Sequence, residues 1–203
     1  AASAFELRVS GQVDEAVQLL NEGLAAHPES GILHYELARA QLLLLDIPAM
    51  YDEAEAAVSC APHDGDFGYF AAMGSAYALI DAAHKQDQAR MEEMGRRIFD
   101  HLETVLADHP GHHEARYLLV QQSVDTAPEV GVEVGDLQSH VQILEREDPV
   151  LGAKARCCLV DDQERHAIWD ALLADRPNDV RAAREAAVGF IEIGDLERAL
   201  AAS

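Results

Sequence analysis

The sequence predicts an all-α protein, an α-solenoid in which antiparallel helix pairs stack side by side. Apolar residues make up 49% of the 203-residue chain and aromatic residues only 5%, and its alanine and leucine content suits closely packed helices. Runs of β-branched residues alternating with polar ones are nearly absent, so a sheet has little support. Prolines recur at Pro28, Pro62, Pro110, Pro149 and Pro177, with spacings of 34, 48, 39 and 28 residues, on the scale of helix-pair repeats.

Chain breakers and apolar periodicity place the helices in order along the chain. The first helix ends at Gly11 and the last pair turns at Gly194, because glycine adopts the positive φ that terminates a helix. Between these turns, short polar segments separate amphipathic runs of helical period. The expected helices span residues 5–10, 14–26, 31–45, 49–60, 66–83, 88–108, 114–125, 136–147, 153–160, 164–175, 180–193 and 195–202.

Three stretches carry a family resemblance: LRVSGQVDEAVQLLNEGLAAHPES (7–30), HYELARA (34–40) and AAVGFIEIGDLERAL (186–200). They share a leucine and a small residue in a first helix, a Gly-Asp or Gly-Gln turn, and a second helix that opens with Asp-Glu-Ala or an equivalent. In these features the chain resembles tetratricopeptide repeat (TPR) proteins. The resemblance implies a right-handed superhelix of about five to six repeats, irregular in the middle. Small residues that let helix axes approach to about 8–10 Å are Ala16, Gly23, Ala38, Ala72, Ala187 and Ala199.

The resemblance covers essentially the whole chain and implies a single solenoid domain over residues 1–203. Its repeats are expected at approximately 1–30, 31–64, 65–112, 113–151, 152–179 and 180–203. The first repeat lacks its opening residues and the last stops within a helix, so we expect truncation at both ends.

Two segments depart from the repeat pattern. Residues 84–97 are polar and lengthen the third pair, and residues 126–136 form a loop with one proline and two glycines. Such a loop is either a functional insertion or one that the fold tolerates at its surface.

The net charge limits the partners. The chain has 37 acidic and 15 basic side chains, a charge of −22 with histidine neutral, which disfavours binding to nucleic acid or to an anionic membrane. A basic peptide or protein would be attracted, although strong acidity also keeps an alanine-rich solenoid soluble. The longest apolar runs fall far short of the roughly 18–20 residues of a membrane span, so we expect a soluble chain without membrane insertion. The opening AASA fits a cleaved signal peptide or an internal cut equally well, so a cytoplasmic and a periplasmic or secreted location both stay open.

Histidines gather near the predicted turns, most densely in ADHPGHHEA, residues 107–115. His109, His112 and His113 are weak candidates for a divalent-metal site, because imidazole and carboxylate suit zinc, nickel or copper. A metal would need three or four ligands converging at about 2.0–2.2 Å, and polar turns account for the same residues without one. We therefore expect no metal and no other cofactor.

Catalytic motifs are missing. The chain has no Gly-rich phosphate loop, no His-Glu-x-x-His, no Cys-x-x-Cys and no nucleophile elbow, so we expect that it is not an enzyme. The odd number of cysteines and the adjacent pair indicate that Cys60, Cys157 and Cys158 are buried, core-filling thiols. The single tryptophan, Trp169, is also expected in the core.

The first helix of each stacked pair lines the concave side of a solenoid, and residues spaced i, i+3 and i+7 face it. Tyrosines occupy the same position of three successive first helices, where the ring either contacts a partner or packs between neighbouring helices. The candidate groove residues are Tyr35, Arg39, Leu42, Tyr69, Met73, Tyr117, Gln121 and Arg184. Arg184, with Arg181, predicts a more basic end.

TPR proteins are mostly scaffolds, so the resemblance implies that the groove binds a peptide or a partner protein. Some members hold a C-terminal carboxylate with groove lysines and asparagines; here Arg39 and Gln121 lie on the comparable faces, and we expect no such clamp. A self-assembling structural solenoid, and with it a homo-oligomer, is the alternative, and a divalent-metal-binding protein is a weaker one.

Overall fold

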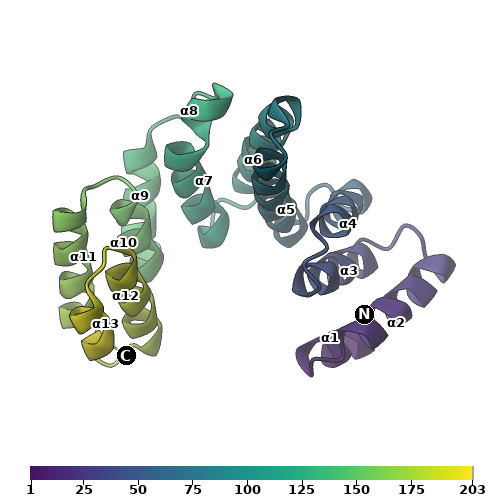
Figure 1. The fold of residues 1–203 in the computed structure, drawn as a ribbon, viewed down its shortest axis with the longest axis horizontal. Coiled ribbons are helices and arrows are strands. Elements are labelled where there is room, and N and C mark those ends of the chain that lie inside the picture. Colours follow the sequence, from purple (N-terminus) through teal and green to yellow (C-terminus); the bar gives the residue numbers. More distant parts are fainter. Residues whose placement is uncertain (203) are drawn as a thin grey trace. The chain divides into compact units, whose positions relative to one another are not determined.

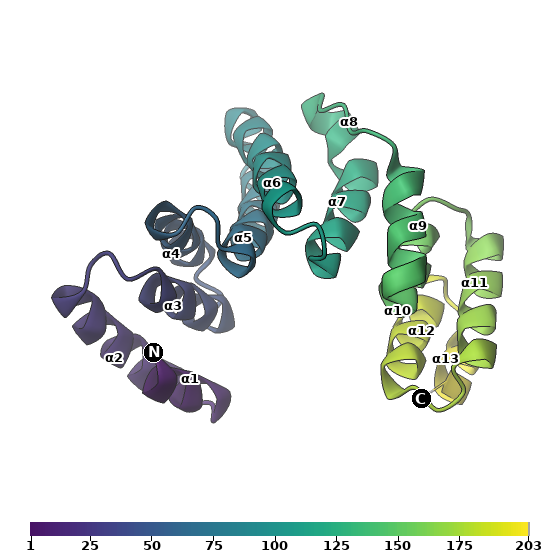
Figure 2. The same ribbon diagram turned by 180° about the vertical axis from the view of Figure 1, so that it is seen from behind.

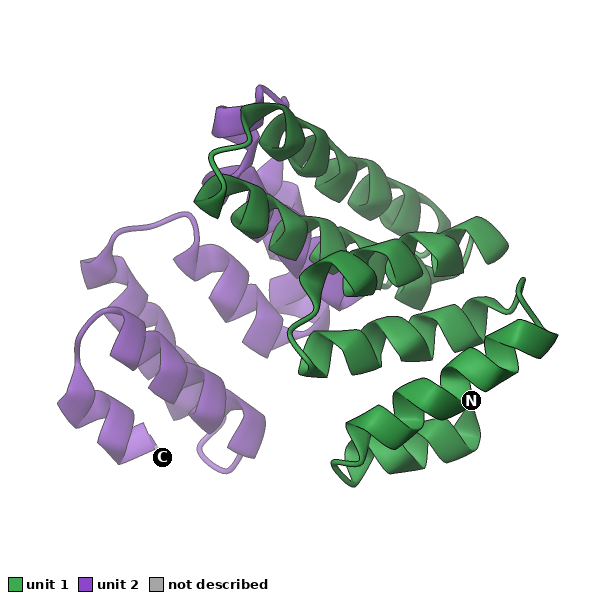
Figure 3. Cartoon of the chain, turned by 45° about the vertical axis from the view of Figure 1, so that its right-hand side comes forward, with its two compact units in different colours: residues 1–112 green, residues 113–203 purple. Residues whose placement is uncertain are grey.

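The computed structural model describes residues 1–202, which fold into helices joined by short turns and contain no strand. The chain divides into two compact units, unit 1 over residues 1–112 and unit 2 over residues 113–203 (Figure 3). This division falls between the third and fourth expected repeats.

Unit 1 consists of three helix pairs (Figure 1). They are α1 (Ala2–Val9) with α2 (Val13–Ala26), α3 (Gly31–Leu43) with α4 (Ile47–Cys60), and α5 (Gly65–His84) with α6 (Gln88–Asp108). Each helix packs on the next along the chain, so the second helix of one pair covers the first helix of the following pair. The fully buried side chains between them include Leu20, Leu37, Met50, Met94, Ile98 and Leu102.

Unit 2 continues the same arrangement with one extra helical turn (Figure 2). Its helices are α7 (His113–Asp125), α8 (Ala127–Val130), α9 (Leu137–Glu147), α10 (Pro149–Cys157), α11 (Asp162–Asp175), α12 (Val180–Glu192) and α13 (Leu196–Ala202). Helix α10 packs against α7, α9, α11 and α12 and is therefore the centre of the unit.

The turns inside the first three pairs and between α12 and α13 each use a left-handed residue. Gly11 has φ +84° and Gly194 φ +79°, which confirms the expectation from sequence. The second and third pairs make the equivalent turn with Leu45 at φ +58° and Gln86 at φ +57°. A non-glycine residue in this region is strained, so these two turns store a small energetic cost.

Aspartates cap most of the helices. Their side chains accept hydrogen bonds from backbone N–H groups of the first turn, where the helix dipole favours a negative charge. The caps are Asp46, Asp64, Asp87, Asp136, Asp148, Asp161, Asp179 and Asp195. Part of the acidic excess therefore stabilises helix ends.

Two expectations about the middle of the chain are wrong. Helix α10 begins at Pro149 rather than Ala153, because proline fits the first helical turn and Asp148 both ends α9 and caps α10. The expected repeat boundary at 151/152 thus lies inside α10. The segment 126–136 contains the short helix α8, which buries Ala127 and Val130, instead of being entirely loop.

Helix length also bears on membranes. Within the part of the chain that the structure describes, no helix combines the length and the apolar composition needed to cross a bilayer.

Candidate binding cavity in unit 2

A cavity of about 230 Å³ lies in unit 2. Its walls come from α7, α10 and α12, the first helices of three successive pairs, with two residues of α11 and with Cys158, which follows α10. The lining residues are Tyr117, Gln121, Val124, Asp125, Lys154, Cys157, Cys158, Arg165, Trp169, Glu185, Val188, Gly189 and Glu192. Two of the candidate groove residues, Tyr117 and Gln121, are among them.

Trp169 and Gly189 form a closely packed part of the wall. Trp169 is 4% exposed and belongs to the core of the unit, which confirms the expectation for this residue. A Cβ atom at position 189 would overlap the indole ring. Glycine at this position thus allows α12 to approach α11 closely.

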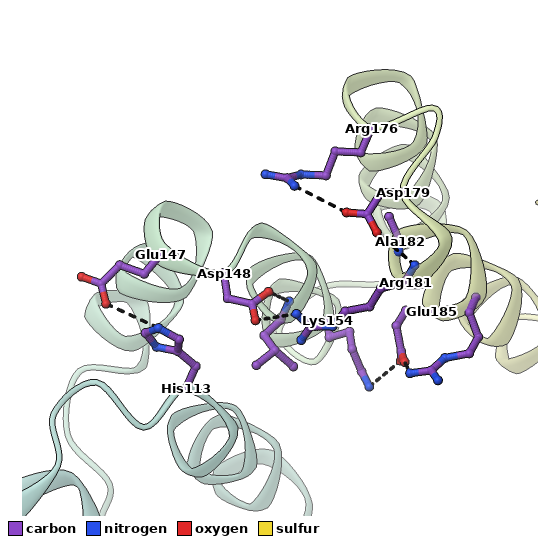
Figure 4. A network of polar contacts seen from close by, with 11 residues as sticks. His113, Glu147, Asp148, Lys154, Arg176, Asp179, Arg181, Ala182 and Glu185 are labelled. Carbon is purple, nitrogen blue, oxygen red and sulfur yellow. Dashed lines mark hydrogen bonds and ion pairs between the residues drawn. The ribbon is translucent and has the colours of Figure 1, made fainter.

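Lys154 is held in place by two contacts. Its ammonium lies 2.7 Å from Oε2 of Glu185 (Figure 4). It also lies 4.9 Å from the ring centroid of Tyr117. Glu185 also accepts a hydrogen bond from Arg184 at 2.8 Å. Burial alone would raise the pKa of Glu185, but the hydrogen bonds from Lys154 and Arg184 outweigh it and lower that pKa.

The other basic residue of the lining is also engaged. Arg165 donates from Nε to the carbonyl oxygen of Cys157 at 2.8 Å and from Nη1 to Asp162 at 3.3 Å. The carboxylates of Asp125 and Glu192, in contrast, make no hydrogen bond and no ion pair with any residue of the range 1–202. The lining thus has two unpaired anionic groups and no unpaired cation.

The two adjacent cysteines supply an uncharged part of the wall. Burial raises the pKa of Cys157 to about 12 and that of Cys158 to about 11, so both thiols stay protonated near neutral pH. The expectation of buried thiols is wrong for Cys60, which is exposed because it ends α4.

In unit 1, the predicted tyrosines pack against neighbouring rings. The Tyr35 ring centroid lies 5.0 Å from that of Phe67 and 5.4 Å from that of Phe70, and both partners belong to the next first helix, α5. The Tyr69 ring lies 5.1 Å from that of His112. The Tyr35 ring thus packs between α3 and α5, and the Tyr69 ring packs on the turn after α6.

Three further predicted residues of unit 1 are half-buried. Arg39 hydrogen-bonds Glu36 at 3.4 Å, and Glu36 also pairs with Arg8 of α1 at 3.1 Å. Leu42 packs on the core cluster around Met50, and Met73 is half-buried on α5.

In unit 2, Tyr117 and Gln121 line the cavity, whereas Arg184 is exposed and the lining instead includes its neighbour Glu185. Arg184 pairs with Glu185, and Arg181 lies 2.8 Å from Asp148 (Figure 4), so carboxylates neutralise the positive charge expected at the last repeat.

The predicted groove residues do not include Lys154, because the sequence analysis assigned no groove residue to the helix pair that contains it. Along α12 the sequence analysis named Arg184 and not the neighbouring Glu185, and it did not name Glu192. Lys154 and Glu185 each lie six residues after a cap aspartate, Asp148 and Asp179, one position beyond the place that Tyr69 takes after Asp64, so the caps give no signal for them.

The candidate metal ligands have other partners. His109 contacts the carbonyl oxygen of His63 at 2.7 Å, His112 lies 3.8 Å from Asp66, and His113 lies 3.9 Å from Glu147. Across residues 1–202, no group of three or more His, Cys, Asp or Glu side chains is arranged to hold a metal ion.

No protein-family model and no curated protein matches the chain. Solved structures do match it. TTC0263, a thermophilic TPR protein of Thermus thermophilus, is 16% identical with a TM-score of 0.59, over 99% of this chain and 84% of its own. YrrB, a TPR protein with an unusual peptide-binding site, is 13% identical with a TM-score of 0.50, over 98% and 78%. A human IFIT1 dimer with PPP-AAAA is 14% identical with a TM-score of 0.53, over 98% and 52%. The chain therefore has the tetratricopeptide-repeat fold that these stacked helix pairs build.

Proposed function

We propose that the chain is a protein-interaction scaffold and that the cavity of unit 2 receives one side chain of a bound peptide or partner segment. The observation that carries this proposal is the lining, to which three successive first helices each contribute. A ligand that spans these helices contacts several repeats at once, as an extended segment does.

The size of the cavity supports a side chain over a cofactor. Sites for drug-sized molecules usually enclose about 300–1,000 Å³, whereas this cavity encloses about 230 Å³. The mixture of tyrosine, tryptophan, valine and charged groups suits one long side chain with a polar end.

The chemistry of the lining gives little support to catalysis. Both thiols are neutral, Lys154 is held by Glu185, and the indole of Trp169 is core. The net charge of −22 also opposes binding of a phosphate chain, which favours a peptide over a nucleic acid.

We extend the proposal to the other predicted positions and assign each group of residues its own role. Gln121 is proposed as a direct contact in the cavity and Arg184 as a contact at its rim. In unit 1, Arg39, Leu42 and Met73 are proposed as partner contacts on the first helices. Tyr35 and Tyr69 are proposed to position these helices through their ring contacts and to offer only the ring edges to a partner.

The test is a selection of binders from a random dodecapeptide display library on the whole chain. Trp169 is the only tryptophan, so its fluorescence reports binding at the cavity. Val188 lines the cavity and is 46% exposed, and Val188→Phe should fill it at little cost to the fold. Val180→Phe, on the same helix at 82% exposure and outside the lining, is the matched control.

We expect Val188→Phe to weaken the selected peptides by at least about tenfold and Val180→Phe to leave their affinity unchanged. Peptides that bind both variants as well as the parent chain would show that binding occurs elsewhere and would contradict the proposal.

A further inference from the structure

We propose that the side chain taken by the cavity is cationic, a lysine or arginine of a basic partner segment, and that Asp125 and Glu192 recognise it. This inference rests on the proposed function and specifies the chemistry of the partner.

The charged residues of the lining determine which ligand charge the cavity favours. Three carboxylates and two cations face the cavity. Glu185 is occupied by Lys154 at 2.7 Å and by Arg184 at 2.8 Å. Arg165 is occupied by the Cys157 carbonyl oxygen and by Asp162. The charge left for a ligand is therefore that of Asp125 and Glu192, and it is negative.

The two carboxylates come from different walls and act on a common space. Asp125 ends α7, and Glu192 ends α12. Tyr117 lines the same cavity as both carboxylates. Burial raises the pKa of its hydroxyl, and the charges of Glu192 and Asp125 are among those that raise it further. The phenol therefore stays protonated, and its oxygen adds a neutral acceptor beside two anionic ones.

A lysine or arginine matches each part of this lining. Its alkyl stem fits against the rings of Tyr117 and Trp169, and its charged end reaches the carboxylates, where charge-assisted hydrogen bonds are strong. An acidic side chain would meet two unpaired carboxylates and no unpaired cation. The charge of −22 on the chain also speeds encounter with a basic segment.

The experiment compares isosteric, charge-removing variants. Asp125→Asn with Glu192→Gln removes both cavity carboxylates and keeps their shape. Glu129→Gln with Glu197→Gln removes two exposed charges of the same unit outside the lining and controls for long-range attraction. All four sites are exposed, so thermal unfolding should show that both double variants fold like the parent.

The probes are the dodecapeptides selected on the whole chain, measured by Trp169 fluorescence at about 0.15 M salt, where distant charges are screened. We expect them to share a lysine or arginine at one position. The cavity double variant should bind them at least about tenfold more weakly, and the control double variant within about twofold of the parent. Replacing the shared lysine by norleucine should weaken binding to the parent but not to the cavity double variant.

Three results would overturn the inference. Peptides that are blocked by Val188→Phe, yet lack a shared cation and ignore the loss of Asp125 and Glu192, would leave the proposed function standing and remove the cationic partner. Spermidine binding as tightly as the peptides, with the same dependence on the two carboxylates, would assign the cavity to a small amine. The absence of any binder sensitive to Val188→Phe would remove both proposals together.

Discussion

Gly189 of α12 lies so close to the indole of Trp169 on α11 that a single methyl group at position 189 would overlap the ring. The indole is 4% exposed and belongs to the core of unit 2, so it has little room to move away. The same contact shapes one wall of the cavity. A change at this pair should therefore affect both stability and the proposed binding.

Gly189→Ala should destabilise the chain by about 1–3 kcal/mol, because it overpacks a filled core and displaces Trp169. Urea unfolding followed by circular dichroism measures this cost. Gly135→Ala in the same unit is the control, because a Cβ there meets nothing within 4 Å. Equal effects at both positions would contradict the assigned contact.

A pH-dependent contact joins α7 and α9. Arg116 Nη1 lies 2.9 Å from Nδ1 of His140, and since arginine only donates, His140 accepts as a neutral imidazole. Burial and then the charge of Arg116 lower the pKa of His140 below its usual 6.5. A lowered histidine pKa means that this stabilisation is fully present above pH 6.5 and is lost as the pH falls through the folded-state value.

The unfolding free energy of the parent chain should therefore fall as the pH drops from about 8 to about 5. His140→Asn keeps an acceptor for Arg116 without the titration, so its stability should fall less over the same range. Parallel urea titrations of the two proteins make the comparison. A steeper loss in the variant than in the parent would reverse the assigned direction.

The left-handed turn at Leu45 predicts a stabilising substitution. Leu45 has φ +58° and is 78% exposed, so Leu45→Gly relieves strain without removing a core contact. We expect a gain of about 0.5–1 kcal/mol. Leu44→Gly, at φ −83°, should give no gain, because glycine there only adds freedom to the unfolded chain. Thermal unfolding measures the stability of both variants. A loss of stability in Leu45→Gly would contradict the assigned strain in this turn.

Tyr35 tests whether the predicted tyrosines serve packing. Its ring contacts Phe67 and Phe70, so Tyr35→Ala should cost about 2–4 kcal/mol of stability. Tyr77 on α5 is 39% exposed, and Tyr77→Ala should cost below about 1 kcal/mol. If Tyr35→Ala is as stable as Tyr77→Ala, the packing role of Tyr35 is contradicted and its ring is available to a partner.

Local signals made most of the fold predictable. The helix over 88–108 was expected with the bounds that α6 has, and most other expected ends lie within two residues of those observed. Gly11 and Gly194 indicated their turns in the sequence, because glycine readily adopts the positive φ that both residues have. Leu45 and Gln86 make the same turn without such a marker, since tertiary packing imposes a conformation that their own preference opposes. The start of α10 at Pro149 was not predicted, because proline occurs both after the end of a helix and in the first turn of one.

The candidate site was less predictable than the fold. Helical periodicity predicted that Tyr117 and Gln121 share one face of α7, and both line the cavity. The pairing of Lys154 with Glu185 depends on the spacing between α10 and α12, which no local pattern encodes. Which carboxylates stay unpaired follows from such pairings, so Asp125 and Glu192 emerge only from the three-dimensional structure.

Amide chemical shifts of the whole chain, with and without a peptide selected on it, test the central claim that partners bind at the cavity of unit 2. The largest changes should fall on the lining segments of α7, α10 and α12, over residues 117–125, 154–158 and 185–192, and Val188→Phe should abolish them. Changes confined to α9, α13 or unit 1, and unaffected by Val188→Phe, would contradict the claim.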